Sequence, residues 1–220
     1  MKHTKIIILL VAFLGLSVVA SAQLLQGKNG LVDEKAKEVI TKAQNKIKST
    51  EGISFVSYVV VKDQEKKERE RHEAKVLLAG NKYRIYVKNH AFYCDGVSVW
   101  HHNKETKEVV VNNIEKEEDN ILNPAKLLAN YEKNFKSKFI RTEEDGTFVI
   151  DFTPKKNKEY HKIRILIDKN YQIKQLEMFY YDSSKTEYII EQYKTGVKSA
   201  ETDFVFDKAA NKDVEVIDMR

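Results

Sequence analysis

The spacing of apolar residues changes along the chain and predicts helices in two places and strands elsewhere. After Asp33, apolar residues recur every three or four positions, at Ala36, Val39, Ile40, Ala43 and Ile47. This spacing is typical of one face of an amphipathic helix, and aspartate is a common cap at a helix N-terminus. After Gly52 the period becomes two. Residues 53–61 are rich in the β-branched and aromatic residues that favour strands.

Short alternating segments separated by turn residues fill most of the remaining chain. The charged stretch 62–71 is expected to be a hairpin loop with frayed strand ends. Further strands are expected at 72–79, 82–87, 90–95, 97–102, 108–112, 147–153, 162–168, 173–181 and 186–193, with a short one near Phe204. Tight turns such as Asp95-Gly96 join antiparallel neighbours, so the strands are expected to form antiparallel meanders.

A second helix is expected to interrupt the strands. Asparagine at 123 followed by Pro124 is a typical helix start. The apolar face then continues through Leu127, Leu128, Tyr131 and Phe135, which predicts a helix over 123–135. About ten strands with two helices predict a mainly β (α+β) fold built on a strongly curved sheet or barrel.

Within the predicted strands, one face is apolar and the other is mostly polar. Ile163, Ile165 and Ile167 share one face of their strand, and Tyr83 faces the opposite way from Arg84. A curved sheet needs a cover over its apolar concave face. The two helices either fill that face as a packed core or cover it loosely above an apolar cavity. The pattern alone favours the packed core.

The N-terminus has the three parts of a secretory signal peptide. Lys2 and Lys5 precede an apolar run over 6–19, and small residues at 20–22 precede Gln23. We therefore expect a signal peptide over 1–22 and a single domain over 23–220. The alternative is an uncleaved anchor, but a membrane span needs about 20 apolar residues.

Composition excludes several classes of function. The formal net charge is +5, and lysines and glutamates are interspersed, which is typical of a solvated surface. No basic run is interleaved with stacking aromatics, so no nucleic-acid partner is expected. Cys94 is the single cysteine and lies in an apolar segment. We expect it to be a buried packing residue outside any disulfide.

Motifs for catalysis are missing from the sequence. His101 and His102 are neighbours on a predicted strand, so their side chains point to opposite faces and cannot share a metal ion. His72, His90 and His161 have no partner at ligand spacing. No Gly-rich phosphate loop, nucleophile elbow or zinc signature occurs. We therefore expect no enzyme activity and no cofactor.

Several short motifs occur in a recognisable order. Residues 80–85 read Gly-Asn-Lys-Tyr-Arg-Ile, and residues 94–100 read Cys-Asp-Gly-Val-Ser-Val-Trp. Further motifs follow at 123–128, 152–155, 173–190, 203–206 and 214–218. Together they resemble the outer-membrane lipoprotein carrier family (LolA) over nearly the whole mature chain. The Asp-Gly-x-x-x-Trp turn is the most specific of them.

The resemblance has three departures. Some members carry an Arg-Pro pair whose arginine holds the lid shut, and Ala79-Gly80 stands there in this chain. Ser98 stands where the family usually has lysine, and Ile85 replaces a tryptophan. The lid latch is therefore not carried over to this chain.

What the resemblance implies is an open antiparallel β-barrel covered by a helical lid. Its apolar cavity would take the acyl chains of lipoproteins, because each methylene removed from water contributes about 0.8 kcal/mol. Such a monomeric carrier works in the periplasm, between an inner-membrane lipoprotein-releasing transporter and an outer-membrane acceptor. The residues expected to line the cavity are Tyr83, Ile85, Trp100, Leu127, Leu128, Tyr131, Ile165 and Met178.

Other classes of function remain open on the same fold. A lipidated acceptor would need a cysteine directly after the signal, and Gln23 stands there. A periplasmic sensor or structural module would bind a protein or a lipid without carrying it. An enzyme would need a site assembled only in three dimensions.

Overall fold

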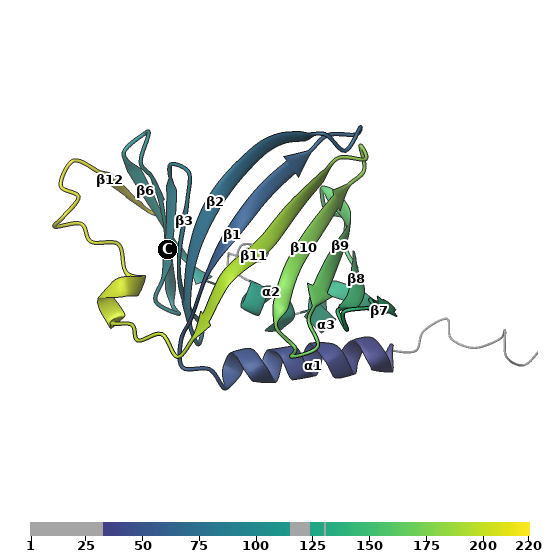
Figure 1. Ribbon diagram of the computed structural model, residues 1–220. Helices are drawn as coiled ribbons and strands as arrows, with labels where there is room; N and C mark the ends of the chain where they lie inside the picture. Colours follow the sequence, from purple (N-terminus) through teal and green to yellow (C-terminus); the bar gives the residue numbers. More distant parts are fainter. Residues whose placement is uncertain (1–32, 115–123, 130) are drawn as a thin grey trace, which may run out of the picture. The chain divides into compact units, whose positions relative to one another are not determined.

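A single sheet of twelve strands organises the described part of the chain (Figure 1). The structure is a computed structural model that describes residues 33–114, 124–129 and 131–220. The predicted signal peptide, residues 23–32 and the predicted cap Asn123 lie outside these residues. Residues 33–220 cluster as one unit.

The strands follow one another around the sheet as two meanders joined side by side. They are β1 (Ile53–Lys62), β2 (Glu68–Ala79), β3 (Lys82–Val87), β4 (His90–Cys94), β5 (Ser98–Asn103), β6 (Glu108–Asn113), β7 (Phe135–Thr142), β8 (Phe148–Pro154), β9 (Tyr160–Ile167), β10 (Ile173–Tyr180), β11 (Lys185–Thr195) and β12 (Glu215–Asp218). Their order is β12-β6-β5-β4-β3-β2-β1-β11-β10-β9-β8-β7. All neighbours are antiparallel except β12, which is parallel to β6.

The first predicted helix is confirmed as α1 (Glu34–Lys48). The Asp33 carboxylate accepts a hydrogen bond of 3.0 Å from the amide of Ala36 and caps the helix. Its second oxygen accepts a hydrogen bond of 2.9 Å from the amide of Phe139 in β7. One carboxylate therefore both starts α1 and fixes it to the edge of the sheet.

Between β6 and β7 the predicted single helix is wrong in its extent. The structure has α2 (Pro124–Ala129) and α3 (Tyr131–Asn134), and Phe135 begins β7. The strand was missed because the buried Phe135 fits the apolar face of a helix. The following residues alternate with a period of two, and Phe139 shares the inner face with Phe135.

Three other elements differ from expectation. β2 begins at Glu68, so the charged hairpin loop is shorter than 62–71, because exposed Glu and Arg residues extend the β1–β2 ladder. Residues near Phe204 form a 3₁₀ helix, η2 (Glu201–Phe204), and not a strand. The short strand β12 was not expected.

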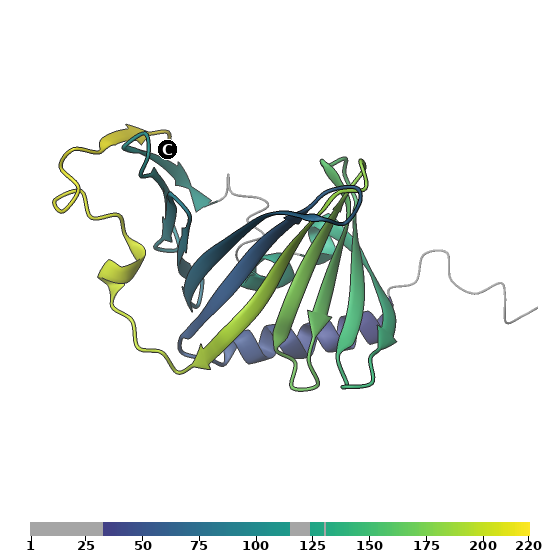
Figure 2. The ribbon, with the colours of Figure 1, turned by 45° about the horizontal axis from the view of Figure 1, so that its top comes forward.

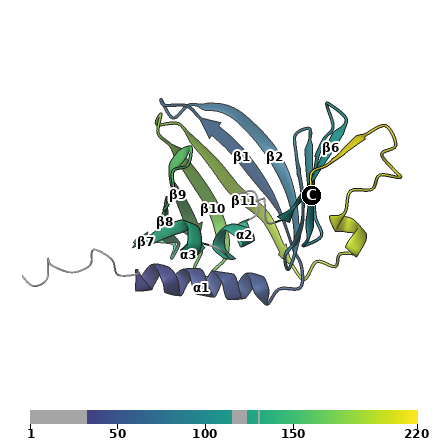
Figure 3. The ribbon, with the colours of Figure 1, turned by 180° about the vertical axis from the view of Figure 1, so that it is seen from behind.

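The sheet is open and strongly curved, and α1, α2 and α3 lie on its inner side (Figures 2 and 3). The mainly β fold is therefore confirmed. The core lies on the inner face in two clusters. The first joins the three helices to β7–β10, and the second joins β1–β5. A small third cluster, Val109, Phe206 and Val214, holds the C-terminal segment against β6.

Candidate functional site

The inner face of the sheet is largely apolar. One cross-strand row runs from β7 to β1 through Phe139, Ile150, Ile165, Leu176, Tyr188 and Val59. A second row runs from β1 to β6 through Phe55, Val76, Ile85, Phe92, His101 and Val110. Residues that pair directly across neighbouring strands point to the same face of a sheet, so all members of each row lie on one side. His101 is the one member of the second row that can carry a charge.

Part of this surface is closed by the helices. Ala36, Val39, Ile40 and Ala43 of α1 are buried, as are Leu127, Leu128 and Tyr131 of the two short helices. The side-chain amide of Gln44 donates a hydrogen bond of 2.7 Å to the carbonyl of Leu128 and ties α1 to α2. The ring of Tyr131 stacks on Phe152 at 5.7 Å between centroids.

Another part of the inner face is only half-buried. It includes Val59, Val87, Phe92 and Tyr188. Burial raises the pKa of the Tyr188 hydroxyl, so this side chain is neutral at physiological pH. The half-buried inner face therefore offers apolar and aromatic surface next to the closed part, and the ion pair of His72 and Glu70 on β2 borders it beside Val59.

Two histidines, His90 on β4 and His101 on β5, lie side by side on the inner face. Nε2 of His101 is 3.0 Å from Nδ1 of His90, and the ring of His101 stacks on Phe92 at 4.4 Å. Burial, followed by the charges of His90 and His102, lowers the pKa of His101. His101 is therefore largely neutral at pH 7. Sequence reasoning missed this contact, because it depends on the register of β4 against β5.

Seven of the eight predicted cavity residues lie in the two inner clusters. They are Tyr83, Ile85, Leu127, Leu128, Tyr131, Ile165 and Met178, and each is at most 9 % exposed. Tyr83 and Ile85 share the β1–β5 cluster, and the other five share the cluster under the helices. They are core residues in this structure, and a role in contacting a ligand stays a prediction.

The structure corrects the prediction that the eighth residue, Trp100, faces the inner cavity. Trp100 pairs with Tyr93 and Val111 and packs with the third cluster on the outer face. Its neighbours Val99 and His101 point inward instead. Trp100 follows the Asp95-Gly96 turn, and the alternation after that turn puts it on the side opposite Tyr83.

Other expectations about side chains are confirmed. Arg84 lies on the outer face, opposite in direction to Tyr83, and bonds Asp203 at 2.6 Å. Cys94 is buried in the β1–β5 cluster, as a packing residue would be. His102 is on the outer face against Phe206, so it does not share a site with His101.

Within residues 33–114, 124–129 and 131–220, no group of three or more His, Cys, Asp or Glu side chains is placed to hold a metal ion. Among the helices that the structure describes, none is long and apolar enough to cross a membrane. A cavity of about 400 Å³ lies on the outer face of the sheet. The cavity predicted from the sequence, between the sheet and the second helix, would lie on the opposite, inner face.

Comparison with solved structures finds proteins that are similar to this chain. An uncharacterised conserved protein from Thermus thermophilus matches with a TM-score of 0.58 at 10 % identity, covering 84 % of this chain and 99 % of that one, and shows the shared fold. A LolA superfamily protein from Nitrosomonas europaea has a TM-score of 0.45 at 11 % identity, covering 78 % and 98 %. The lipoprotein LppX from Mycobacterium tuberculosis has a TM-score of 0.45 at 9 % identity, covering 76 % and 100 %.

No curated protein matches the chain. The family profile described as "Outer membrane lipoprotein carrier protein LolA" matches residues 88–207. This match begins in the turn after β3, ends in the C-terminal segment, and includes α2, α3 and the strands β4 to β11. Because it covers more than half of the 220 residues, the chain belongs to the LolA family.

Proposed function

We propose that this protein is a periplasmic carrier that binds the acyl chains of lipoproteins and shuttles them from the inner to the outer membrane. The observation that carries the proposal is the apolar inner face, which continues past the helices into the half-buried region around Phe92 and Tyr188. Family membership supports the same role. The partners would be acylated lipoproteins, an inner-membrane releasing transporter and an outer-membrane acceptor, and the carrier would act as a monomer without enzymatic activity.

The two short helices would act as the lid. α2 and α3 span six and four residues, and helices this short have little stability of their own in water. They are held by the burial of Leu127, Leu128 and Tyr131 against the inner face. An acyl chain would compete for that same apolar surface, at about 0.8 kcal/mol for each methylene removed from water. Displacement of the helices therefore exchanges one apolar contact for another.

The test uses Leu127→Glu and Leu128→Glu, measured by release of a lipoprotein from inner-membrane vesicles into the soluble fraction. Both variants should lose release, because a carboxylate on this side of α2 would be buried against the inner face. Ala129→Glu is the matched control, since Ala129 is exposed and receives the same side chain in the same helix, one residue after Leu128. Wild-type release by Leu127→Glu, with a native circular dichroism spectrum, would disprove the lid.

A sensor or structural module on the same fold is the second candidate. The close packing of Leu128 and Tyr131 favours it, because the inner face beneath them is already filled. Mass spectrometry of protein purified without detergent separates the two. Co-purified acyl species support the carrier, and their absence, together with failure to release lipoproteins, supports the module.

A further inference from the structure

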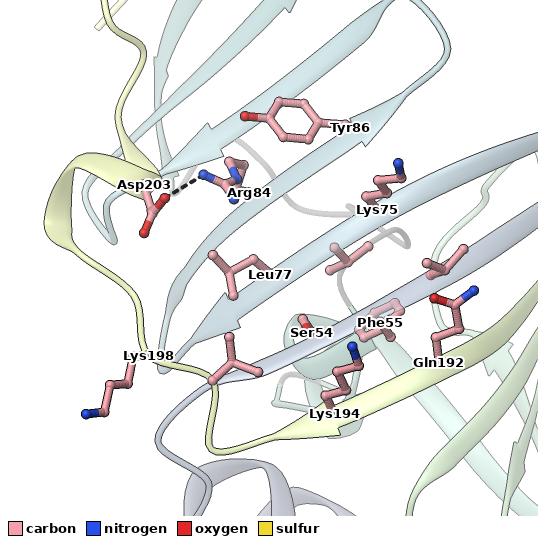
Figure 4. A pocket seen from close by; sticks show the side chains of 13 residues that line it. Ser54, Phe55, Lys75, Leu77, Arg84, Tyr86, Gln192, Lys194, Lys198 and Asp203 are labelled. Atoms are coloured by element: carbon pink, nitrogen blue, oxygen red, sulfur yellow. Dashed lines mark hydrogen bonds and ion pairs between the residues drawn. The ribbon is translucent and has the colours of Figure 1, made fainter.

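The outer-face cavity of about 400 Å³ lies where β11, β1, β2 and β3 meet the segment 197–203 (Figure 4). The sheet separates it from the apolar inner face, so it is a different site from that of the proposed carrier function. Its volume falls in the range of small-molecule pockets, about 300–1,000 Å³. The lining residues are Ser54, Phe55, Val56, Lys75, Val76, Leu77, Arg84, Tyr86, Gln192, Lys194, Val197, Lys198 and Asp203.

The floor of this pocket consists of two cross-strand rows on the outer face. The first row is Arg84, Leu77, Ser54 and Lys194, from β3 to β11. The second row begins Tyr86, Lys75 and Val56. Neighbouring strands are about 4.8 Å apart, so the backbones of Arg84 and Lys194, at the two ends of the first row, lie roughly 14 Å apart, with Leu77 and Ser54 between them. The pocket forms because the shorter side chains of Ser54 and Leu77 lie between the long side chains of Arg84 and Lys194.

A β-bulge in β11 directs side chains into the pocket. Ser54 pairs with Lys194 but Val56 pairs with Glu191, so two residues of β11 lie opposite Phe55. Tyr193 turns inward and stacks on Phe55, whereas Gln192 and Lys194 line the outer pocket. Gln192 has a φ of +49°, which costs a non-glycine residue conformational energy. Bulges and strained backbone of this kind concentrate at functional sites.

The segment 197–203 forms a fixed wall. The amide of Val197 donates a hydrogen bond of 3.2 Å to the carbonyl of Gly52. The carboxylate of Asp203 accepts one of 2.9 Å from the amide of Ala200 and one of 2.6 Å from Arg84. Because both ends of the wall are bonded, the pocket exists before any ligand binds.

Positive charge dominates the lining. Four cationic side chains face one carboxylate, and that carboxylate, on Asp203, is already paired with Arg84. Lys75 lies 3.4 Å from Glu73, and both are well exposed. Within the part of the chain that the structure describes, Lys194 and Lys198 form no ion pair, and both are exposed at the rim. Two ammonium groups are therefore available for an anionic ligand.

We propose that this pocket binds a small amphipathic anion, with its phosphate or carboxylate group at Lys194 and Lys198 and a short apolar portion on Val56 and Leu77. Lysine ammonium groups are common phosphate ligands, and the apolar floor adds contact area. An extended peptide is disfavoured, because β11, β1, β2 and β3 are each paired on both sides and offer no free edge for strand addition.

The experiment is calorimetric titration with dihexanoyl phosphatidylglycerol below its micelle concentration. Dihexanoyl phosphatidylcholine has the same chains and a zwitterionic head group. We expect at least tenfold tighter binding of the anionic lipid, weakened by salt. Inorganic phosphate is the third arm. If phosphate competes with the lipid, the result supports the site and indicates that its ligand is a free oxyanion. If phosphate does not compete, the result supports a lipid head group as the ligand.

Two charge-reversal variants make the test specific. Lys194→Glu combined with Lys198→Glu should weaken binding at least tenfold, and both lysines are exposed, so folding should be unaffected. Lys136→Glu combined with Lys138→Glu makes the same charge change on exposed positions of β7 and should keep wild-type affinity. Equal affinity for both lipids, or unchanged affinity in the Lys194 and Lys198 variant, would overturn the proposal. The Leu127→Glu variant should still bind the anionic lipid at the outer-face pocket. Failure of the carrier proposal can therefore be distinguished from failure of this one.

Discussion

The carbonyl oxygen of Val197 lies 2.0 Å from the position that a Cβ atom on Gly52 would occupy. The Val197 amide also donates a hydrogen bond to the Gly52 carbonyl. Glycine at position 52 is therefore required by close approach of backbone, at the point where the C-terminal segment leaves β11 and crosses the start of β1. This contact positions one wall of the outer-face pocket.

From this contact we predict that Gly52→Ala destabilises the protein by about 1–3 kcal/mol, because backbone must move to admit the methyl group. Chemical denaturation measures the loss, and hydrogen exchange at the Val197 amide should become faster in the same variant. Gly80→Ala is the comparison. Gly80 has a φ of +61° and nothing within 4 Å of its Cβ position, so its cost of about 1 kcal/mol is conformational and leaves Val197 protected. Slow exchange at Val197 in Gly52→Ala would contradict the clash.

Asp33 gives a second prediction, since its two carboxylate oxygens serve different elements. Asp33→Ala removes the cap of α1 and the acceptor of the Phe139 amide, and should cost about 2 kcal/mol or more. Asp33→Asn keeps one oxygen for the cap but presents an NH₂ group to Phe139, so it should lose about half as much. Urea denaturation of the two variants tests this order. Equal losses would show that only one of the two bonds stabilises the protein.

The outer face of β11 gives a prediction about pH. Glu187 lies 2.8 Å from the ammonium of Lys62 and also bonds Lys185. Burial raises the pKa of Glu187, but the hydrogen bonds and charges of the two lysines outweigh it and leave that pKa below its usual value. A depressed carboxylate pKa stabilises the fold above the unfolded-state value of 4.5, and this stability is lost as the pH falls through the folded-state value.

The change to measure is therefore Glu187→Gln. It should cost about 1–3 kcal/mol at pH 7, and the difference from wild type should shrink as the pH falls below 4. Thermal unfolding at several pH values follows both proteins. Glu144→Gln is a control on an exposed turn outside β11 and should show no such trend. A difference that stays constant between pH 7 and pH 3 would exclude the electrostatic explanation.

Much of the fold could be predicted because the apolar period is clear in each element. Ile163, Ile165 and Ile167 alternate without interruption, and all three are buried on the inner face. The same reasoning failed at Phe135, where a buried aromatic residue fits either a helix or a strand. It also failed at Trp100, because the facing of a residue after a turn depends on where pairing resumes. A one-residue difference there moves a side chain to the opposite face.

The outer-face pocket was beyond prediction from the sequence for a related reason. Alternation from Tyr188 onward places Tyr193 on the outer face and Lys194 on the inner face. The bulge at Gln192 reverses both, and no glycine or asparagine marks it. The wall of the pocket also comes from residues 197–203, which are held by isolated contacts to Gly52, Arg84 and Lys82 and not by a strand ladder.

Gln192 itself gives the last prediction. Its φ of +49° lies in the left-handed region, which asparagine tolerates and β-branched residues avoid. Gln192→Val should therefore destabilise the protein by about 1–3 kcal/mol, whereas Gln192→Asn should be nearly neutral. Urea denaturation compares the two. The valine variant should also bind the anionic lipid more weakly, because removing the bulge would turn Lys194 inward and break the stacking of Tyr193 on Phe55. If valine and asparagine gave equal stability and equal lipid affinity, the strained bulge would have no part in shaping the pocket.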